Sequence, residues 1–227
     1  MLKNFVPTAH FPTPAHMPND VAKIPSHLLS PIAFGRFSVD EAREVVEAVG
    51  KVAVDIGDGL TLLHMAAQHE LVEVAEFLIE RGHPLDCQTD GVAETPLDQA
   101  AWRGSLEVAE LLVLAGANIN CTTTGGYTPL HRCAFYGHGQ LAARLLLFGA
   151  STTIQDGDGK LAYECAMEEG HDRIASLLEP ILGPDGEDMR VAMYARNNPN
   201  HPLHRPEAAE ALRSLSRFEN EANQPST

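Results

Sequence analysis

Histidine and cysteine are the residues of this chain best suited to metal binding or nucleophilic catalysis, and the sequence contains 11 histidines and four cysteines. The cysteines are at least 12 residues apart, so the paired spacing of a zinc site is missing. His64 and His69 are five residues apart, whereas two ligands on one helix face need a spacing of four. We therefore predict no metal, no cofactor and reduced thiols at Cys87, Cys121, Cys133 and Cys165.

Motifs of common catalytic sites are also missing from the sequence. It has no GxSxG nucleophile turn, no P-loop and no GxGxxG after a strand. Cys133 occupies a small-residue position of a predicted helix, where a thiol is expected to be buried and inert. We predict that the chain is not an enzyme. The alternative is a ligand-binding or enzymatic module in the tails, which would use His201, His204 and Arg205.

An internal repeat organises the middle of the chain. The segments TLLHMAAQHE from Thr61, TPLDQAAWRG from Thr95 and TPLHRCAFYG from Thr128 begin 34 and then 33 residues apart. A leucine follows each threonine after 17 residues, and a glycine follows it after 21. A fourth segment, LAYECAMEEGH from Leu161, keeps the 33-residue step but lacks the Thr-Pro pair. Such a period predicts stacked units that share one continuous core.

Each repeat is predicted to form two helices. The Thr-Pro pairs at 95–96 and 128–129 are helix start signals, because a threonine hydroxyl caps free backbone amides and proline fits the first helical position. Gly104 and Gly137 are predicted to end the first helix. The second helix has apolar residues at helical spacing, namely Val74, Phe77 and Leu78 and, one repeat later, Val108, Leu111 and Leu112.

The pattern resembles the ankyrin-repeat family over about residues 55–179. The motif residues of the resemblance are Thr61, His64, Thr95, Pro96, Thr128, Pro129, His131, Gly137, His138, Gly170 and His171. The resemblance implies an all-α solenoid of units with two antiparallel helices and a protruding finger loop, in which His64 and His131 tie loop backbone together. It also makes Asn120 a candidate modification site, because some ankyrin proteins are hydroxylated on asparagine at this position.

The repeats are predicted at 55–88, 89–121, 122–155 and 156–180. Residues 26–54 are predicted to be a degenerate capping repeat, with a first helix from His27 to Phe34 that contains Pro31 and a second helix capped by Ser38 or Asp40. Two departures from the period stand out. The second finger has one extra residue within 91–94, and Glu70 stands where a helix-ending glycine is expected.

Tails flank the predicted repeats. Residues 1–25 contain five prolines and are predicted to be an extended arm. Residues 181–227 are predicted to be a loop-rich tail with a short amphipathic helix at about 206–220.

The resemblance implies that a partner binds on a concave face made by the finger loops and the outward positions of each first helix. Trp102, Phe135 and Tyr136 are predicted to be exposed there, and aromatic residues and arginine dominate interface hot spots. The face includes Gln68, His69, Glu94, Gln99, Trp102, Arg103, Tyr127, Arg132, Phe135, Tyr136, Glu168 and Glu169, with Leu60, Met65, Lys160 and Cys165 at equivalent positions. The alternative is that a tail of the same chain covers these aromatic residues.

Charge narrows the class of partner. The formal net charge is -15, which argues against nucleic acid and anionic lipid as partners. Residues 122–155 contain two arginines and no acidic residue, so repeats 2 and 3 should suit an apolar peptide with one or two acidic residues. The sequence has no apolar run of 18 residues and no secretory signal, so no membrane insertion and an intracellular location, cytoplasmic or nuclear, are expected.

These observations predict a non-catalytic adaptor or scaffold that binds another protein or peptide through a surface centred on repeats 2 and 3. The chain is predicted to be a monomer. The alternative is a structural subunit of a larger complex that docks through its C-terminal helix.

Overall fold

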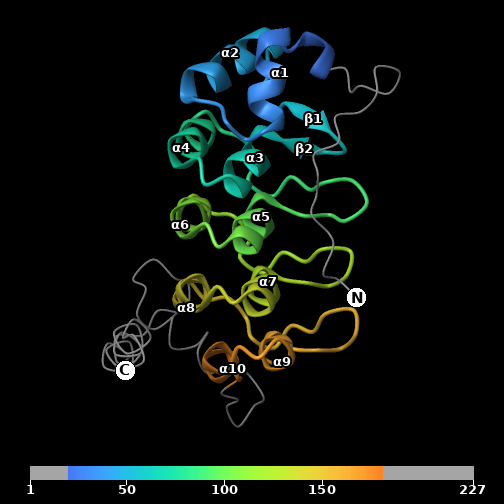
Figure 1. Ribbon diagram of the computed structural model, residues 1–227, viewed down its shortest axis with the longest axis vertical. Helices are drawn as coiled ribbons and strands as arrows, with labels where there is room; N and C mark the ends of the chain where they lie inside the picture. The colour runs from blue at the N-terminus through green and yellow to red at the C-terminus, as the bar shows by residue number, and fades with distance from the viewer. Residues whose placement is uncertain (1–19, 181–227) are drawn as a thin grey trace. The chain divides into compact units, whose positions relative to one another are not determined.

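A computed structural model describes residues 20–180 of the chain. It divides into two compact units, of which the first ends at Asn118 and the second begins at Ile119. Both units consist of short helices in consecutive pairs, as Figure 1 shows. The fold is therefore all-α, apart from one small hairpin, and this confirms the predicted class.

The first unit contains three helical pairs. The described elements are α1 (Ser26–Ala33), α2 (Val39–Val49), α3 (Leu62–Gln68), α4 (Val72–Glu80), α5 (Pro96–Arg103) and α6 (Leu106–Leu114). An antiparallel hairpin of β1 (Asp55–Gly57) and β2 (Leu60–Thr61) precedes α3. The first helices α3 and α5 pack side by side, and the second helices α2, α4 and α6 form a separate row (Figure 1).

The second unit contains two helical pairs within its described residues. These are α7 (Pro129–Tyr136) with α8 (Gly139–Leu147), and α9 (Ala162–Glu168) with α10 (Asp172–Leu178). Helix α7 packs against α9, and α8 packs against α10. A single bridge between Gln155 and Leu161 closes the loop before α9.

Reciprocal capping boxes start the first helices. The hydroxyl of Thr95 accepts a hydrogen bond from Asp98 N at 3.3 Å, and Asp98 Oδ2 accepts one from Thr95 N at 3.0 Å. Thr128 and His131 make the same exchange at the start of α7. Each box satisfies two backbone amides that have no partner inside the helix. In α9, Leu161 cannot cap, and only Glu164 Oε2 accepts from Leu161 N, at 2.7 Å.

Left-handed residues end the first helices. Gly104 and Gly137 have φ values of 84° and 81°, as the sequence predicts. At the corresponding position after α3, Glu70 has a φ of 58°. A left-handed conformation costs a residue with a side chain about 1–2 kcal/mol. The chain therefore stores backbone strain at this turn, where the sequence breaks the glycine pattern.

Small side chains allow the first helices to approach closely. Ala66 and Ala67 of α3 and Ala100 and Ala101 of α5 are fully buried. Ser105, at the start of α6, donates its hydroxyl to Ala67 O at 2.9 Å and links the two repeats. The second helices contribute the apolar core residues Val45, Val46, Val49, Val74, Phe77, Leu78, Val108 and Leu112, all buried, whereas Leu111 is only partly buried.

Helices α1 and α2 lie within the segment predicted to be a capping repeat. Ser38 is the N-cap of α2 and accepts from Glu41 N, while Asp40 lies inside the helix. Pro31 lies within α1, two residues before its end. The capping repeat therefore keeps both of its helices in spite of this proline.

The predicted extended arm differs from the structure at its end. Val21–Lys23 forms a 3-10 turn, and Val21 and Ile24 are buried. Asp20 Oδ2 accepts from Asp55 N at 3.2 Å and forms an ion pair with Lys51. The side chains of Lys51 and Lys23 and the Asp55 amide lower the pKa of Asp20, although its partial burial acts in the opposite direction. Residues 1–19 and the predicted helix at 206–220 lie outside the described residues.

Candidate functional site

Two buried histidines fix the finger loops. Thr61 N donates to His64 Nδ1 at 3.1 Å, so the ring proton lies on Nε2, which donates to Glu94 O at 3.0 Å. His131 repeats this arrangement with Thr128 N and Lys160 O. Burial lowers the pKa of His64 to about 4 and also lowers the pKa of His131. Both imidazoles thus join the backbone at the start of a first helix to the backbone of the next finger, the kind of contact that the resemblance implies.

Each finger loop is closed by its own backbone. Thr123 N donates to Tyr127 O at 3.0 Å, and Asp156 N donates to Lys160 O at 2.9 Å. In the second finger the corresponding bond joins Thr89 N to Glu94 O at 2.9 Å and encloses one residue more. Ala93, with a φ of 59°, accommodates that extra residue. The extra residue predicted within 91–94 therefore lies in the finger, as expected.

A recurring contact joins each finger to its own first helix. Gln99 Nε2 donates to Glu94 Oε2 at 2.8 Å in repeat 2. In repeat 3, the Arg132 guanidinium lies 5.8 Å from the centroid of the Tyr127 ring. These pairs occupy the same two positions, five residues apart, but their chemistry differs. The first pair presents amide and carboxylate groups, and the second presents a cation over an aromatic ring.

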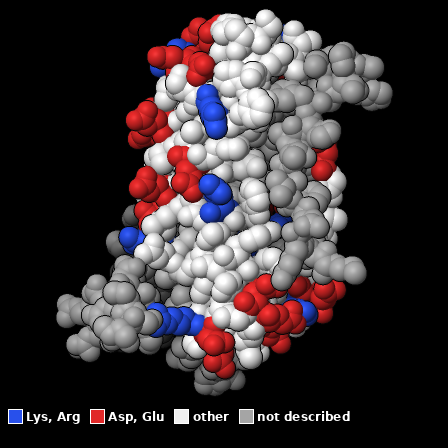
Figure 2. All heavy atoms as spheres, in the orientation of Figure 1, with Lys and Arg blue, Asp and Glu red and all other residues white. Residues whose placement is uncertain are grey.

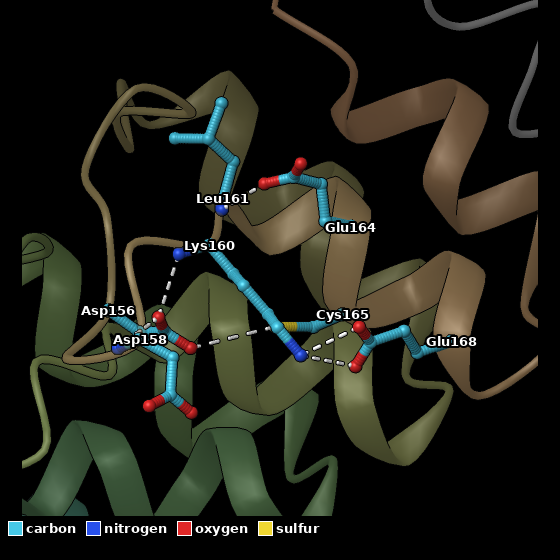
Figure 3. Close-up of polar contacts among 7 residues, drawn as sticks. All are labelled: Asp156, Asp158, Lys160, Leu161, Glu164, Cys165 and Glu168. Atoms are coloured by element: carbon cyan, nitrogen blue, oxygen red, sulfur yellow. Dashed lines mark hydrogen bonds and ion pairs between the residues drawn. The ribbon is translucent and has the colours of Figure 1, made fainter.

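In repeat 4 the finger lysine reaches further along the helix. Figure 3 shows Lys160 Nζ between the two carboxylate oxygens of Glu168, at 2.6 and 2.7 Å. Asp156 Oδ1 accepts from the amides of Asp158 and Lys160, both at 2.9 Å, so this acidic residue shapes the loop. Sequence spacing did not reveal the Lys160–Glu168 pair, because its members are eight residues apart.

Aromatic residues gather on helix α7 and its finger. The rings of Phe135 and Tyr136 meet edge to face with centroids 5.0 Å apart, and Tyr136 stacks with His138 at 6.3 Å. Tyr127 packs its ring edge to face with His131. Tyr136 is 36% exposed, and Phe135, Tyr127 and Arg132 are partly exposed. This unit therefore presents an aromatic and basic surface, which we name the α7 surface, formed by Tyr127, Arg132, Phe135 and Tyr136.

Three positions predicted to point outward are buried. Met65 is fully buried, and Gln99 and Cys165 are 4% and 7% exposed. The prediction of exposure is wrong for these residues because this position of the first helix lies under the finger, as the Glu94–Gln99 contact shows. The next two outward positions are more open. Trp102, Gln68 and His69 are partly exposed, and Arg103, Glu168 and Glu169 are exposed.

Several contacts near these positions were not predicted from the sequence. Arg103 Nε lies 3.6 Å from Glu70 Oε1, so the strained turn after α3 contacts the end of α5. The ring of His69 lies against the backbone at Gly35, where an added Cβ would come within 2.1 Å of it. Exposed apolar side chains also occur away from the predicted face, at Phe34, Leu114 and Met167. No periodic signal distinguishes such positions from core residues.

The described cysteines are poor nucleophiles. All four are free thiols, and Cys133 is fully buried. Burial, together with the nearby Asp156 and Glu168 carboxylates, raises the pKa of Cys165 to about 11. Burial also raises the pKa of Cys87. A thiol that stays protonated at neutral pH does not supply the reactive thiolate.

Other features of residues 20–180 bear on the kind of site. No three His, Cys, Asp or Glu side chains there come together in a way that could hold a metal ion. None of their helices is long and apolar enough to cross a membrane. Asn120, the candidate modification site, is partly buried, and its Oδ1 accepts from Ser151 N at 2.8 Å. His201, His204 and Arg205 lie outside the described residues.

Acidic side chains border the first unit on the side of its second helices. Figure 2 shows them along the edge formed by α2, α4 and α6, where Glu44, Glu73, Glu76 and Glu107 are exposed. These four carboxylates are solvated.

Paired helices, finger loops and histidine-fixed turns define a class of helical repeat proteins. The family model for ankyrin repeats (3 copies) matches residues 40–123 and 97–189, and the chain belongs to the ankyrin-repeat family. Repeats of this family bind protein partners.

One curated relative adds a comparison. The chain is 25% identical over 173 residues to a Danio rerio protein named "Putative palmitoyltransferase ZDHHC13". The matched region covers 74% of this chain and 25% of that protein, so the chain corresponds to about a quarter of the relative's length.

Proposed function

We propose that this chain is a non-catalytic adaptor that binds a partner protein through the finger and first-helix residues of repeats 2 and 3. The observation that supports this most directly is the α7 surface, where partly exposed Tyr127, Phe135 and Tyr136 accompany Arg132. Aromatic rings left partly in water contribute little to folding, whereas such rings beside arginine are the usual anchors of protein interfaces.

Residues of repeat 2 belong to the proposed interface as well. Trp102 and Arg103 end helix α5, and the polar pair of Glu94 and Gln99 lies at its start. Gln68 and His69 hold the equivalent positions of α3. In the proposal these side chains contact the partner, while His64 and His131 only hold the fingers in place.

A binding role fits the side-chain chemistry better than catalysis does. The two buried histidines already use both ring nitrogens in backbone contacts, and the raised pKa values of Cys87 and Cys165 keep these thiols protonated. The Danio rerio relative, whose name describes a palmitoyltransferase, is about four times as long as the region that matches this chain. We infer that the shared region is the partner-binding part and that this chain acts inside the cell, in cytoplasm or nucleus, as a monomer.

Affinity capture tests the proposal with three variants of the full chain. Tyr136→Ala and Trp102→Ala should each reduce recovery of the proteins captured by the wild type at least tenfold. Leu114→Ala is the matched control, because Leu114 is 72% exposed on the second helix α6 and should not affect capture.

Thermal unfolding of the same variants separates binding from folding. The proposal expects the two aromatic variants to unfold close to the wild-type temperature. Equal recovery by all four proteins, or a loss of capture that follows a loss of stability, contradicts the proposed interface.

The second candidate function, a subunit that docks through a C-terminal helix, concerns residues 206–220, which lie outside the described residues.

A further inference from the structure

The last first helix that the structure describes, α9, leaves apolar side chains uncovered. Its Met167 is 60% exposed, and its Tyr163 is partly exposed. Helix α9 packs against α7 on one side and against its own partner α10 (Figure 1). These contacts leave most of Met167 uncovered. The two residues therefore form an apolar surface, which we name the α9 end face.

The corresponding positions of the other first helices are buried. The alanines at the position of Met167 are fully buried, and the leucines at the position of Tyr163 are at most 1% exposed: Ala67, Ala101, Ala134, Leu63, Leu97 and Leu130. In each unit a first helix packs against the one that follows it, α3 against α5 and α7 against α9. Ser105 also donates to Ala67 O at 2.9 Å from the following repeat. A following repeat therefore covers these positions, and α9 has no such cover among residues 20–180.

The type of residue at this end indicates that something covers it. A repeat in a stack buries its apolar face against its neighbours, so the last repeat needs a covering element or polar side chains. Met167 is apolar, and its long, unbranched side chain is suited to filling an irregular gap. An end that faced water would instead be expected to present a polar residue at this position.

The chain itself continues with a segment of suitable sequence. The family model for ankyrin repeats matches as far as residue 189, which is beyond the described residues. The sequence MRVAMYARNN follows at 189–198, and its Val191 and Ala195 are four residues apart, as are Leu130 and Ala134 on α7. This spacing repeats the pair that is buried on each earlier first helix.

Two further features of this segment agree with such a role. Asn198 stands three residues after Ala195, as Gly137 stands three after Ala134, and a proline follows it. Asparagine is the usual substitute for a helix-ending glycine, and proline is common directly afterwards. Residues 189–198 also contain two basic residues and no acidic one, whereas the acidic residues that follow Met167, Glu168 and Glu169, are exposed.

We propose that residues 189–198 cover the α9 end face of the same molecule, with Val191 and Ala195 against Tyr163 and Met167. The connection is long enough, because ten residues separate the end of α10 at Leu178 from residue 189. Ten extended residues span up to about 33 Å, whereas packed helices stand about 8–10 Å apart. This inference does not depend on the partner-binding surface of repeats 2 and 3.

Disulfide trapping in the full chain tests the placement. Met167→Cys combined with Ala195→Cys should give a disulfide within one molecule under mild oxidation, identified by mass spectrometry of the digested monomer. Met167→Cys combined with Leu212→Cys is the matched control, because Leu212 belongs to the other apolar segment of the tail, 206–220. The proposal expects at least tenfold more of the first disulfide. A preference for the Leu212 position, a disulfide between two molecules, or no disulfide overturns it.

Charged substitutions test whether the contact stabilises the fold. Met167→Asp and Ala195→Asp should each lower the melting temperature of the full chain by at least about 4 °C. Hydrogen exchange of the α9 amides should also become at least tenfold faster. The double variant should lose little more than either single variant, because both substitutions break the same contact.

Leu212→Asp is the control for these measurements and should leave both unchanged. Circular dichroism must show that every variant is folded at the starting temperature. An unchanged melting temperature in Met167→Asp would mean that the α9 end face is in water, since substitutions of solvated residues have little effect on stability. That result, additive losses in the double variant, or a loss in Leu212→Asp without one in Ala195→Asp overturns the inference, and each leaves the proposed function intact.

Discussion

At the scale of single residues, the buried histidines make folding sensitive to acid. His64 is neutral in the folded state because burial lowers its pKa to about 4, whereas an unfolded histidine titrates near 6.5. Between these values the unfolded chain binds more protons than the folded chain, so stability falls as the pH falls. The pKa of His131 is also lowered, so this residue likewise makes the folded state less stable as the pH falls.

The free energy of unfolding should therefore decrease between pH 6.5 and 4. The contribution of His64 amounts to roughly 3 kcal/mol at most, since one pKa unit corresponds to about 1.4 kcal/mol. Urea unfolding at several pH values measures the slope, and His64→Gln should reduce it. A slope that is unchanged in the variant would mean that other groups cause the acid sensitivity.

Gln99 predicts a second effect at this scale. Replacing it by methionine removes a buried carbonyl that accepts no hydrogen bond, and it also removes the amide's bond to the partly exposed Glu94 carboxylate. Gln99→Met should therefore raise the free energy of unfolding by about 1 kcal/mol. Chemical denaturation checks this value. A destabilised variant would show that the hydrogen bond from Gln99 to Glu94 stabilises the fold by more than the buried carbonyl costs.

At the scale of helices, the glycine that ends α7 serves two purposes. Gly137 has a φ of 81°, and an added Cβ would lie 2.8 Å from the His171 ring of the next repeat. Gly170 ends α9 with a φ of 78° and has open space around it. The two positions therefore differ in contact but share the same backbone conformation.

This pair separates backbone strain from steric contact. Gly170→Ala should cost about 1–2 kcal/mol, the left-handed penalty alone. Gly137→Ala should cost more, by about another 1–3 kcal/mol, because the imidazole must move within a packed interface. Thermal unfolding of both variants provides the comparison. Equal losses would contradict a steric role for His171.

The helices were predictable from the sequence because their signals are local. Thr-Pro pairs, terminal glycines and apolar spacing all act within one repeat, and they gave the helix starts, the helix ends and most of the core. The site was less predictable. Whether residue 99 points to water or lies under a finger depends on a contact with Glu94, and the Lys160–Glu168 pair depends on how far a lysine reaches. Periodicity contains neither piece of information.

At the scale of the whole molecule, the charge is unbalanced. The chain has a formal net charge of -15, and many acidic side chains are exposed on α2, α4 and α6 of the first unit (Figure 2). Mutual repulsion of these charges opposes the compact state, whereas exposed ion pairs such as Lys160–Glu168 add little stability.

Salt should therefore stabilise this protein. Raising sodium chloride from about 20 mM to about 0.5 M shortens the range of repulsion to a few ångströms and should increase the melting temperature by about 2–4 °C. Differential scanning fluorimetry at constant pH measures the change. A lower melting temperature at high salt would show that attractive pairs outweigh the repulsion.

The left-handed Ala93 has a consequence for engineering. The second finger contains one residue more than the third and fourth, yet the Glu94 carbonyl still accepts from both Thr89 N across the loop and His64 Nε2 on α3. The extra length is thus absorbed at the tip, between two fixed backbone anchors. The segment from 90 to 93 is consequently the place where new sequence could be grafted to change what the protein recognises without altering the helices that support it.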